Sequence, residues 1–138
     1  MLYLAARNEN YENLIKPHLN RKVILIDRFI DSTMAYQHYG FKIDKRIIKV
    51  LNNFILGNLK PNFTFFHFVP LKNIKINISG KKNKYDYFSK KFYNKVQKGF
   101  LNILKKNVNK SIIDSSKNKK YNIELIKNKI NKILNIND

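Results

Sequence analysis

Short apolar runs alternate with stretches of helical periodicity along this chain, and that alternation constrains its fold more than any other feature. The apolar runs predict buried parallel strands at residues 22–26, 63–69 and 110–114. Helical spacing predicts helices at residues 2–20, 43–57, 85–106 and 121–136, and a short helix from Pro70 to about Ile78. Pro17 should end the first helix and Gly57 should cap the second. The pattern indicates an α/β fold with a parallel sheet.

The chain carries a formal net charge of +19, from 28 Lys and Arg residues against 9 Asp and Glu residues. Such an excess is typical of proteins that bind nucleic acids. Lys, Asn and Ile are all over-used, however, and they share A/T-rich codons, so a biased genome would give the same profile. We favour that explanation, and a nucleic-acid-binding surface stays the alternative. Because Arg is rare, its occurrences are candidates for two-point contacts that Lys cannot make, namely Arg7, Arg21, Arg28 and Arg46.

Several classes of protein are excluded by what the sequence lacks. The chain has no cysteine, which excludes a disulfide scaffold, a Cys-zinc site and a thiol nucleophile. No apolar run approaches 18 residues and no secretory signal is visible, so we expect a cytoplasmic protein without a membrane span. The scattered His18 and His38 predict no metal site built by protein side chains alone, and His67 is expected to be a packed strand residue rather than a ligand. The length suits one domain over residues 1–138.

Polar side chains follow the first predicted strand at the end where parallel sheets bind ligands. Asp27 and Arg28 stand directly after residues 22–26, and the segment DSTMAYQ (31–37) adds hydroxyls, an amide and a phenol. A guanidinium with neighbouring donors suits a phosphate, which accepts two parallel hydrogen bonds from it. From spacing alone, a solvated loop is an equally good interpretation.

Five blocks in this order resemble the thymidylate kinase family: LYLAAR (2–7), IKPHL (15–19), VILIDRFIDSTMAYQHYG (23–40), LNNFILGNLKPNFT (51–64) and FYNKVQKGFL (92–101). The resemblance covers essentially the whole chain and corresponds to the C-terminal two-thirds of a family member. It implies a P-loop kinase-like three-layer fold that here lacks the N-terminal strand, the P-loop and the first helix. It also implies ATP-dependent phosphorylation of dTMP to dTDP, with Mg²⁺ accompanying ATP.

The resemblance places several residues around the thymine base of dTMP. Tyr3 would stack on the thymine ring, and Arg7, one helical turn later, would reach the base edge. Ser32 and Thr33 stand where polar side chains contact the base.

Further positions are implied for the phosphate and the sugar. Arg28 would bind the 5′-phosphate, and Asp27 would help to order the phosphate and the magnesium. Tyr36 would pack near the sugar 2′ position and exclude ribonucleotides, and Gln37 completes the same block.

Two further segments match the family less closely. A lid-like basic segment at residues 79–91 has Lys82 and Lys84 as catalytic candidates where the family has arginines, so its clamp should be weaker. A merely solvated basic loop is the alternative interpretation. The residues Asp114, Ser115 and Ser116 correspond to the loop beside the adenine of ATP. Phe68 departs from the family, which usually has Asp there.

The sequence contains no G-x-x-x-x-G-K-[ST] motif, which in the family holds the phosphates of ATP. We therefore expect these residues alone to lack phosphoryl transfer, and the sheet to lack its central strand between residues 22–26 and 63–69. The main hypothesis is a thymidylate kinase that retains its dTMP-binding half and forms a homodimer as in the family. The alternatives are an inactive fragment that binds dTMP or a partner, and a basic nucleic-acid-binding protein.

Overall fold

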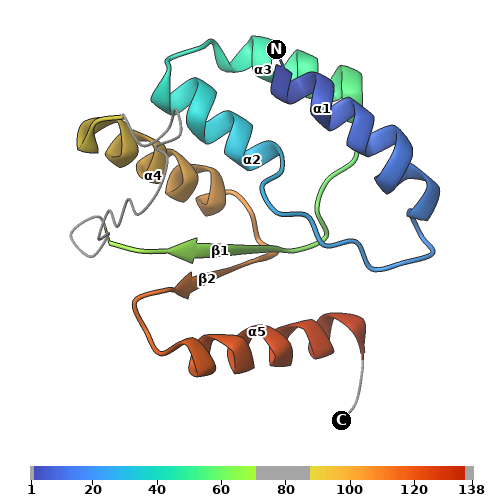
Figure 1. The fold of residues 1–138 in the computed structure, drawn as a ribbon, viewed down its shortest axis with the longest axis vertical. Helices are drawn as coiled ribbons and strands as arrows, with labels where there is room; N and C mark the ends of the chain where they lie inside the picture. Colours follow the sequence, from blue (N-terminus) through green and yellow to red (C-terminus); the bar gives the residue numbers. More distant parts are fainter. Residues whose placement is uncertain (1, 71–87, 136–138) are drawn as a thin grey trace, which may run out of the picture. The chain divides into compact units, whose positions relative to one another are not determined.

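The computed structural model describes residues 2–70 and 88–135 (Figure 1). The chain forms two compact units. The helical unit comprises residues 1–60 and 91–106, and the sheet unit comprises residues 61–90 and 107–138. The assignment of residues 1–138 to a single domain stays a prediction.

The helical unit begins with a helix that changes its hydrogen-bonding pattern before it ends. Helix α1 (Leu2–Asn10) continues into the π-helical turn η1 (Tyr11–Ile15) and the 3₁₀ turn η2 (Lys16–His18). Pro17 lies in the first turn of η2, and Leu19 leaves the helix with an extended backbone. The predicted end of the first helix near Pro17 is thus confirmed.

A second helical stretch was missed by the sequence prediction. Helix α2 (Ile30–Thr33) continues directly into the π-helical segment η3 (Met34–Gly40). This stretch contains the segment DSTMAYQ, for which a solvated loop was one interpretation. Its residues are half-buried or buried, and Ala35 is fully buried, so that loop interpretation is wrong.

Helix α4 (Lys90–Lys105) packs closely against η3, and two glycines make the approach possible. A Cβ atom on Gly99 of α4 would lie 2.6 Å from Cγ of Tyr39. A Cβ atom on Gly40 would lie 2.8 Å from the ring of Phe92. Real Cβ atoms do not approach other heavy atoms this closely, so a larger residue at either position would force the neighbouring ring to shift.

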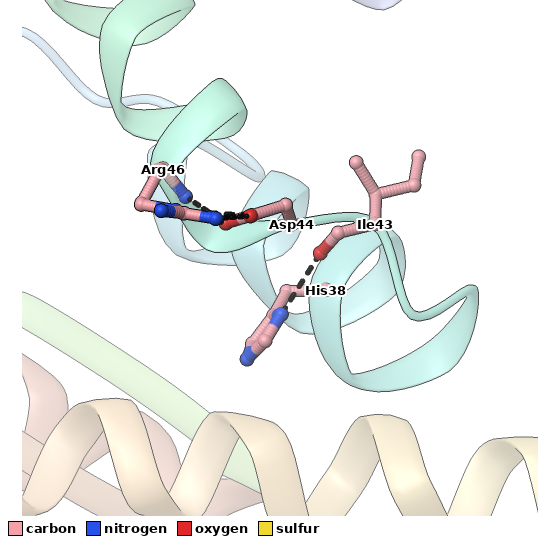
Figure 2. A network of polar contacts seen from close by, with 4 residues as sticks. All are labelled: His38, Ile43, Asp44 and Arg46. Atoms are coloured by element: carbon pink, nitrogen blue, oxygen red, sulfur yellow. Dashed lines mark hydrogen bonds and ion pairs between the residues drawn. The ribbon is translucent and has the colours of Figure 1, made fainter.

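Helix α3 (Lys45–Leu56) has a well-defined cap at each end. At the first end, the Asp44 carboxylate accepts a hydrogen bond of 2.8 Å from the backbone N–H of Arg46. The Arg46 guanidinium also donates to this carboxylate, with Nε 3.0 Å and Nη2 2.6 Å from Oδ2 (Figure 2). At the other end, Gly57 follows the helix as the predicted cap: its N–H donates to the Asn53 carbonyl oxygen, and its φ of +57° is a value that favours glycine. Nearby, the His38 ring lies 2.9 Å from the Ile43 carbonyl oxygen.

The sheet unit is built on two parallel strands, which Figure 1 shows side by side. Strand β1 (Thr64–Phe68) pairs with strand β2 (Lys110–Asp114), in a register from Thr64 opposite Lys110 to Phe68 opposite Asp114. Helix α5 (Lys119–Leu134) follows β2 after a short loop, and Asn118 caps its first turn. The predicted α/β class with parallel strands is confirmed, and so are the strands at residues 63–69 and 110–114.

The prediction of a strand at residues 22–26 is wrong. The segment is irregular, and its side chains are largely exposed, with 62% of Val23 and 84% of Leu25 accessible. A strand exists only through hydrogen bonds to a neighbour, and no strand among the described residues lies beside this segment. An apolar run alone therefore did not suffice to make a strand.

Other boundaries differ in detail from the sequence prediction. Within the described residues, α4 begins at Lys90 rather than at Tyr85, and α5 begins two residues earlier than expected. The short helix expected from Pro70 to Ile78 lies, apart from Pro70 itself, outside the described residues. Residues buried in the helical unit are Ile15, Ala35, Ile48, Leu56, Val96 and Leu104, and Ile113 is buried in the sheet unit.

The cap of α3 yields a test in which two substitutions separate hydrogen bonding from charge. We expect Asp44→Ala to lower the exchange protection of the first-turn amides of α3 several-fold, because the orphan N–H of Arg46 loses its acceptor. Asp44→Asn should retain most of the protection, since Asn also caps helices. Hydrogen exchange measured by NMR distinguishes the two, and equal losses in both variants would show that the ion pair rather than the cap holds this end.

The same contact should make the start of α3 sensitive to acid. Hydrogen bonds from Arg46 hold the pKa of the Asp44 carboxyl below its ordinary value. The stabilisation is therefore complete above the ordinary carboxyl range and is lost as the pH falls through the lowered value. Protection factors of the α3 first turn should follow this course in the parent and not in Asp44→Ala.

Candidate functional site

The backbone of Arg28 adopts an uncommon conformation at the point where the sequence predicts a ligand contact. Its φ is +60°, in the left-handed region that costs an ordinary residue about 1–2 kcal/mol. The conformation brings its guanidinium carbon 5.9 Å from the centre of the Tyr36 ring. Backbone strain of this kind is concentrated at sites that hold ligands, which supports a role for Arg28 beyond packing.

No carboxylate among the described residues forms an ion pair with Arg28. Arg46 differs in this respect, because Asp44 neutralises it. An exposed guanidinium without a carboxylate keeps its paired N–H donors for an anion. The local geometry can thus bind a phosphate or a carboxylate.

The helical stretch of α2 and η3 carries four of the predicted site residues. Ser32 and Tyr36 stand four residues apart, as do Thr33 and Gln37, so each pair lies on neighbouring turns. All four are half-buried. The structure therefore brings the hydroxyls, the phenol and the amide onto one short element next to Arg28.

The ring of Tyr36 is held by aromatic contacts with α4. Its centre lies 6.2 Å from that of Phe92 and 6.3 Å from that of Phe100, the second in an edge-to-face arrangement. These separations are within the range of favourable aromatic pairs. The position of the phenol is thus fixed by the same packing that Gly40 and Gly99 permit.

Arg7 connects α1 to two other segments of the helical unit. Its Nη1 donates to Oδ1 of Asn52 at 3.1 Å, and its Nη2 donates to the carbonyl oxygen of Phe29 at 3.2 Å. The guanidinium also lies 5.6 Å from the centre of the Phe29 ring. Burial lowers the pKa of Arg7, which remains charged at neutral pH. Tyr3, one turn earlier on α1, is 57% exposed.

Two carboxylates stand near this cluster in the sequence, in different environments. Asp27 is exposed. Asp31, in the first turn of α2, was not among the residues predicted from the sequence. It is half-buried, and burial raises the pKa of its carboxyl. Its position in the sequence between the predicted site residues Arg28 and Ser32 could have identified Asp31 as a further candidate.

The predicted adenine loop forms the end of β2 in the sheet unit. Oδ1 of Asp114 accepts hydrogen bonds from the Ser116 backbone N–H at 3.0 Å and from its hydroxyl at 2.6 Å. These bonds lower the pKa of Asp114. The Ser115 hydroxyl lies 3.2 Å from Nδ1 of His67 in β1. His67 is exposed, so the expectation that it packs inside the sheet is wrong.

The remaining predicted positions are not placed. Lys82 and Lys84 lie outside the described residues, as does most of the lid-like segment 79–91. Across residues 2–70 and 88–135, no three His, Asp or Glu side chains gather in a way that could hold a metal ion. A cavity of about 180 Å³ in the helical unit adjoins the end of α3 and is lined by Ile30, Asn52 and Leu56 among others, none of which is a predicted site residue.

Comparison with known proteins identifies the family to which the chain belongs. The family model of thymidylate kinase matches residues 1–130. The chain belongs to the thymidylate kinase family. Among curated thymidylate kinases, that of Wolbachia pipientis wMel is 40% identical over 125 residues, which are 88% of this chain and 62% of the relative. That of Ehrlichia chaffeensis is 36% identical over 128 residues, 90% of this chain and 60% of the relative.

A solved structure shows the same family relation. The crystal structure of thymidylate kinase from Ehrlichia chaffeensis matches with a TM-score of 0.68 and 31% sequence identity, over 91% of this chain and 62% of that one. The chain thus spans about three-fifths of the length of the thymidylate kinases it matches. Among the helices that the structure describes, none combines the length and the apolar character needed to cross a bilayer.

Proposed function

We propose that this chain carries the dTMP-binding part of a thymidylate kinase, which phosphorylates dTMP to dTDP with ATP and Mg²⁺. The observation that carries the proposal is the strained Arg28, which has no carboxylate partner among the described residues and lies beside Tyr36 within a family match over residues 1–130. Strained backbone is common at sites that hold ligands, and the role proposed for Arg28 is to bind the dTMP phosphate with its guanidinium.

The other contacts of dTMP are assigned to the same unit. Ser32 and Thr33 contact the base, and Tyr36 packs against the sugar at its 2′ carbon, with Gln37 beside it. The fixed ring of Tyr36 supports this role, because a rigid wall excludes an extra hydroxyl better than a mobile one.

Tyr3 and Arg7 complete the base site in this proposal. The exposed ring of Tyr3 is available for stacking on thymine. Arg7 uses two of its five N–H donors on Asn52 and Phe29, so the remaining donors can serve the base edge. The same two bonds orient the guanidinium before the nucleotide arrives.

The residues present fit a magnesium ion that arrives with the nucleotide. Mg²⁺ is commonly held by one or two carboxylates together with substrate phosphates, and the exposed Asp27 beside Arg28 can supply one carboxylate. Bound there, the ion would neutralise charge on the phosphates. Asp27 would then hold its water ligands, and Arg28 would orient the acceptor phosphate.

The residues do not fit the phosphates of ATP in the same way. The 138 residues contain no G-x-x-x-x-G-K-[ST] motif, so no cradle for those phosphates is assigned to them. Asp114, Ser115 and Ser116 are proposed to flank the adenine, and Lys82 and Lys84 to contribute charge from the lid-like segment. A cytoplasmic homodimer is proposed on family membership alone.

The proposal is tested by calorimetric titration of the chain with dTMP. We expect binding that dCMP matches poorly and that changes little between 50 and 200 mM salt. Binding of a single-stranded oligonucleotide that collapses over about the same salt range would instead favour a nucleic-acid-binding protein. We expect no phosphorylation of dTMP by ATP and Mg²⁺ with this chain alone. Failure to bind dTMP would reject the proposal, and turnover would show that other residues here hold the ATP phosphates.

The role of Arg28 predicts a specific loss. Arg28→Lys should weaken dTMP binding by about 1–3 kcal/mol, because one charge-assisted bond of a two-point contact is lost. Arg21→Lys is the matched control, since Arg21 is an exposed arginine that the proposal leaves outside the site. Unchanged affinity in the Arg28 variant, measured by calorimetry, would remove this residue from the site.

The role of Tyr36 predicts a change in selectivity. Tyr36→Ala should narrow the preference for dTMP over its ribonucleotide equivalent, because the wall at the sugar is removed. Tyr36→Phe retains the ring and its contacts with Phe92 and Phe100, so it should retain most of the preference. The ratio of the two dissociation constants is the quantity to compare, and equal ratios in all three proteins would place the selectivity elsewhere.

A further inference from the structure

Two neighbouring asparagines in the last turns of α3 have different surroundings. Asn52 is half-buried, and its Oδ1 accepts the hydrogen bond of 3.1 Å from Nη1 of Arg7 on α1. Asn53 is exposed, and its side chain makes no hydrogen bond with the described residues. Of the two, Asn52 therefore connects α3 to the helix that carries Arg7.

The chemistry of this contact fixes the orientation of the Asn52 amide. A guanidinium has five N–H donors and no acceptor, so the amide has to turn its oxygen toward Arg7. The second bond of Arg7 leaves from Nη2 and ends on the carbonyl oxygen of Phe29 at 3.2 Å. Because the two bonds leave from separate nitrogens of one rigid plane, together they fix how that plane is rotated.

The two anchors of Arg7 differ in kind. The Phe29 acceptor is a backbone carbonyl, which is present whatever the side chain, whereas the other acceptor belongs to the side chain of Asn52. Without Asn52, the guanidinium would keep one bond and could pivot about it. Hydrogen bonds weaken steeply below a donor angle of about 120°, so such a pivot would spoil the aim of the remaining N–H donors.

The aim of an arginine matters for the choice between pyrimidine bases. Thymine presents the acceptor O4 at the position where cytosine presents an amino group, which is a donor. A guanidinium can only donate, so it suits thymine and disfavours cytosine. Uracil presents the same oxygen as thymine and differs by the methyl group. An N–H of Arg7 can discriminate between thymine and cytosine only while it points at this position.

We propose that Asn52 is a positioning residue that sets the selection of thymine over cytosine, because it fixes the guanidinium plane of Arg7. This inference rests on the proposed function, which takes Arg7 as the residue at the base edge. It deepens that function by giving control of base selectivity to a side chain on α3 that is not one of the proposed dTMP contacts.

The test compares the dissociation constants of dTMP, dUMP and dCMP, measured by calorimetry with the whole chain. Asn52→Leu keeps the size of the side chain and removes the acceptor. We expect it to lower the preference for dTMP over dCMP by about tenfold, which is the value of one charge-assisted bond. The preference for dTMP over dUMP should stay the same, since both bases present O4. Asn53→Leu is the matched control and should change neither preference.

Two further substitutions separate positioning from packing. Asn52→Asp offers an oxygen at the same place and should retain the preference of the parent for dTMP over dCMP. Asn52→Ser stays polar but ends one bond short of Arg7, so it should lose this preference as Asn52→Leu does, and it replaces that variant if leucine prevents folding. A packing defect would instead weaken the binding of all three nucleotides alike and leave both preferences unchanged.

The outcomes that contradict the inference are specific. An unchanged preference for dTMP over dCMP in folded Asn52→Ser would overturn it, and so would an equal loss in Asn52→Asp or in Asn53→Leu. Failure of the proposed function would be seen in the parent chain, which would then bind no dTMP or would bind dCMP equally well. That result would reject both proposals, whereas a selective parent with selective Asn52 variants would reject this inference alone.

Discussion

A single half-buried guanidinium holds together the segments on which the candidate site depends. Arg7 extends from α1 to the Phe29 carbonyl, directly after Arg28, and to Asn52 on α3. Both partners are neutral, so the bonds are charge-assisted without a buried ion pair, which avoids the cost of desolvating a second charge. The two bonds leave from separate nitrogens of one rigid plane, a geometry that a single lysine ammonium does not reproduce, so an arginine suits this position of a lysine-rich chain.

The second constraint is the close approach of α4 to the stretch that follows Arg28. Glycines at 40 and 99 leave room for the side chains of Phe92 and Tyr39 against the opposite helix, and the rings of Phe92 and Phe100 hold Tyr36. The site residues are therefore positioned by a packed core in the same unit. An exposed loop would leave these side chains mobile. In a packed core, a backbone displacement of a few tenths of an ångström at either glycine would instead shift the Tyr36 ring.

The elements predicted best from the sequence were helices with strong local signals and strands whose hydrogen bonds are satisfied by a neighbouring strand. Helix α3 carried its apolar periodicity and its terminal glycine, and β1 and β2 satisfy each other's hydrogen bonds. Residues 22–26 had the same apolar signal but no neighbouring strand among the described residues. The blocks that resemble thymidylate kinases predicted Arg28 and Tyr36 as site residues, and this stays a prediction. No sequence pattern announced the left-handed backbone of Arg28 or the burial of Asp31, because both arise from tertiary packing.

The π-helical hydrogen bonds of η3 have a consequence for the phase of the helix. The Phe41 N–H donates to the Tyr36 carbonyl oxygen five residues earlier, at 2.9 Å, so this stretch is wound more widely than an α-helix. The wider winding keeps both Tyr36 and Phe41 directed toward Phe92 of α4, with ring centres 6.2 Å and 5.0 Å from that of Phe92. In an ordinary α-helix, residues five positions apart point about 140° away from each other. The winding of this segment is thus as much a determinant of the candidate site as the identity of its side chains.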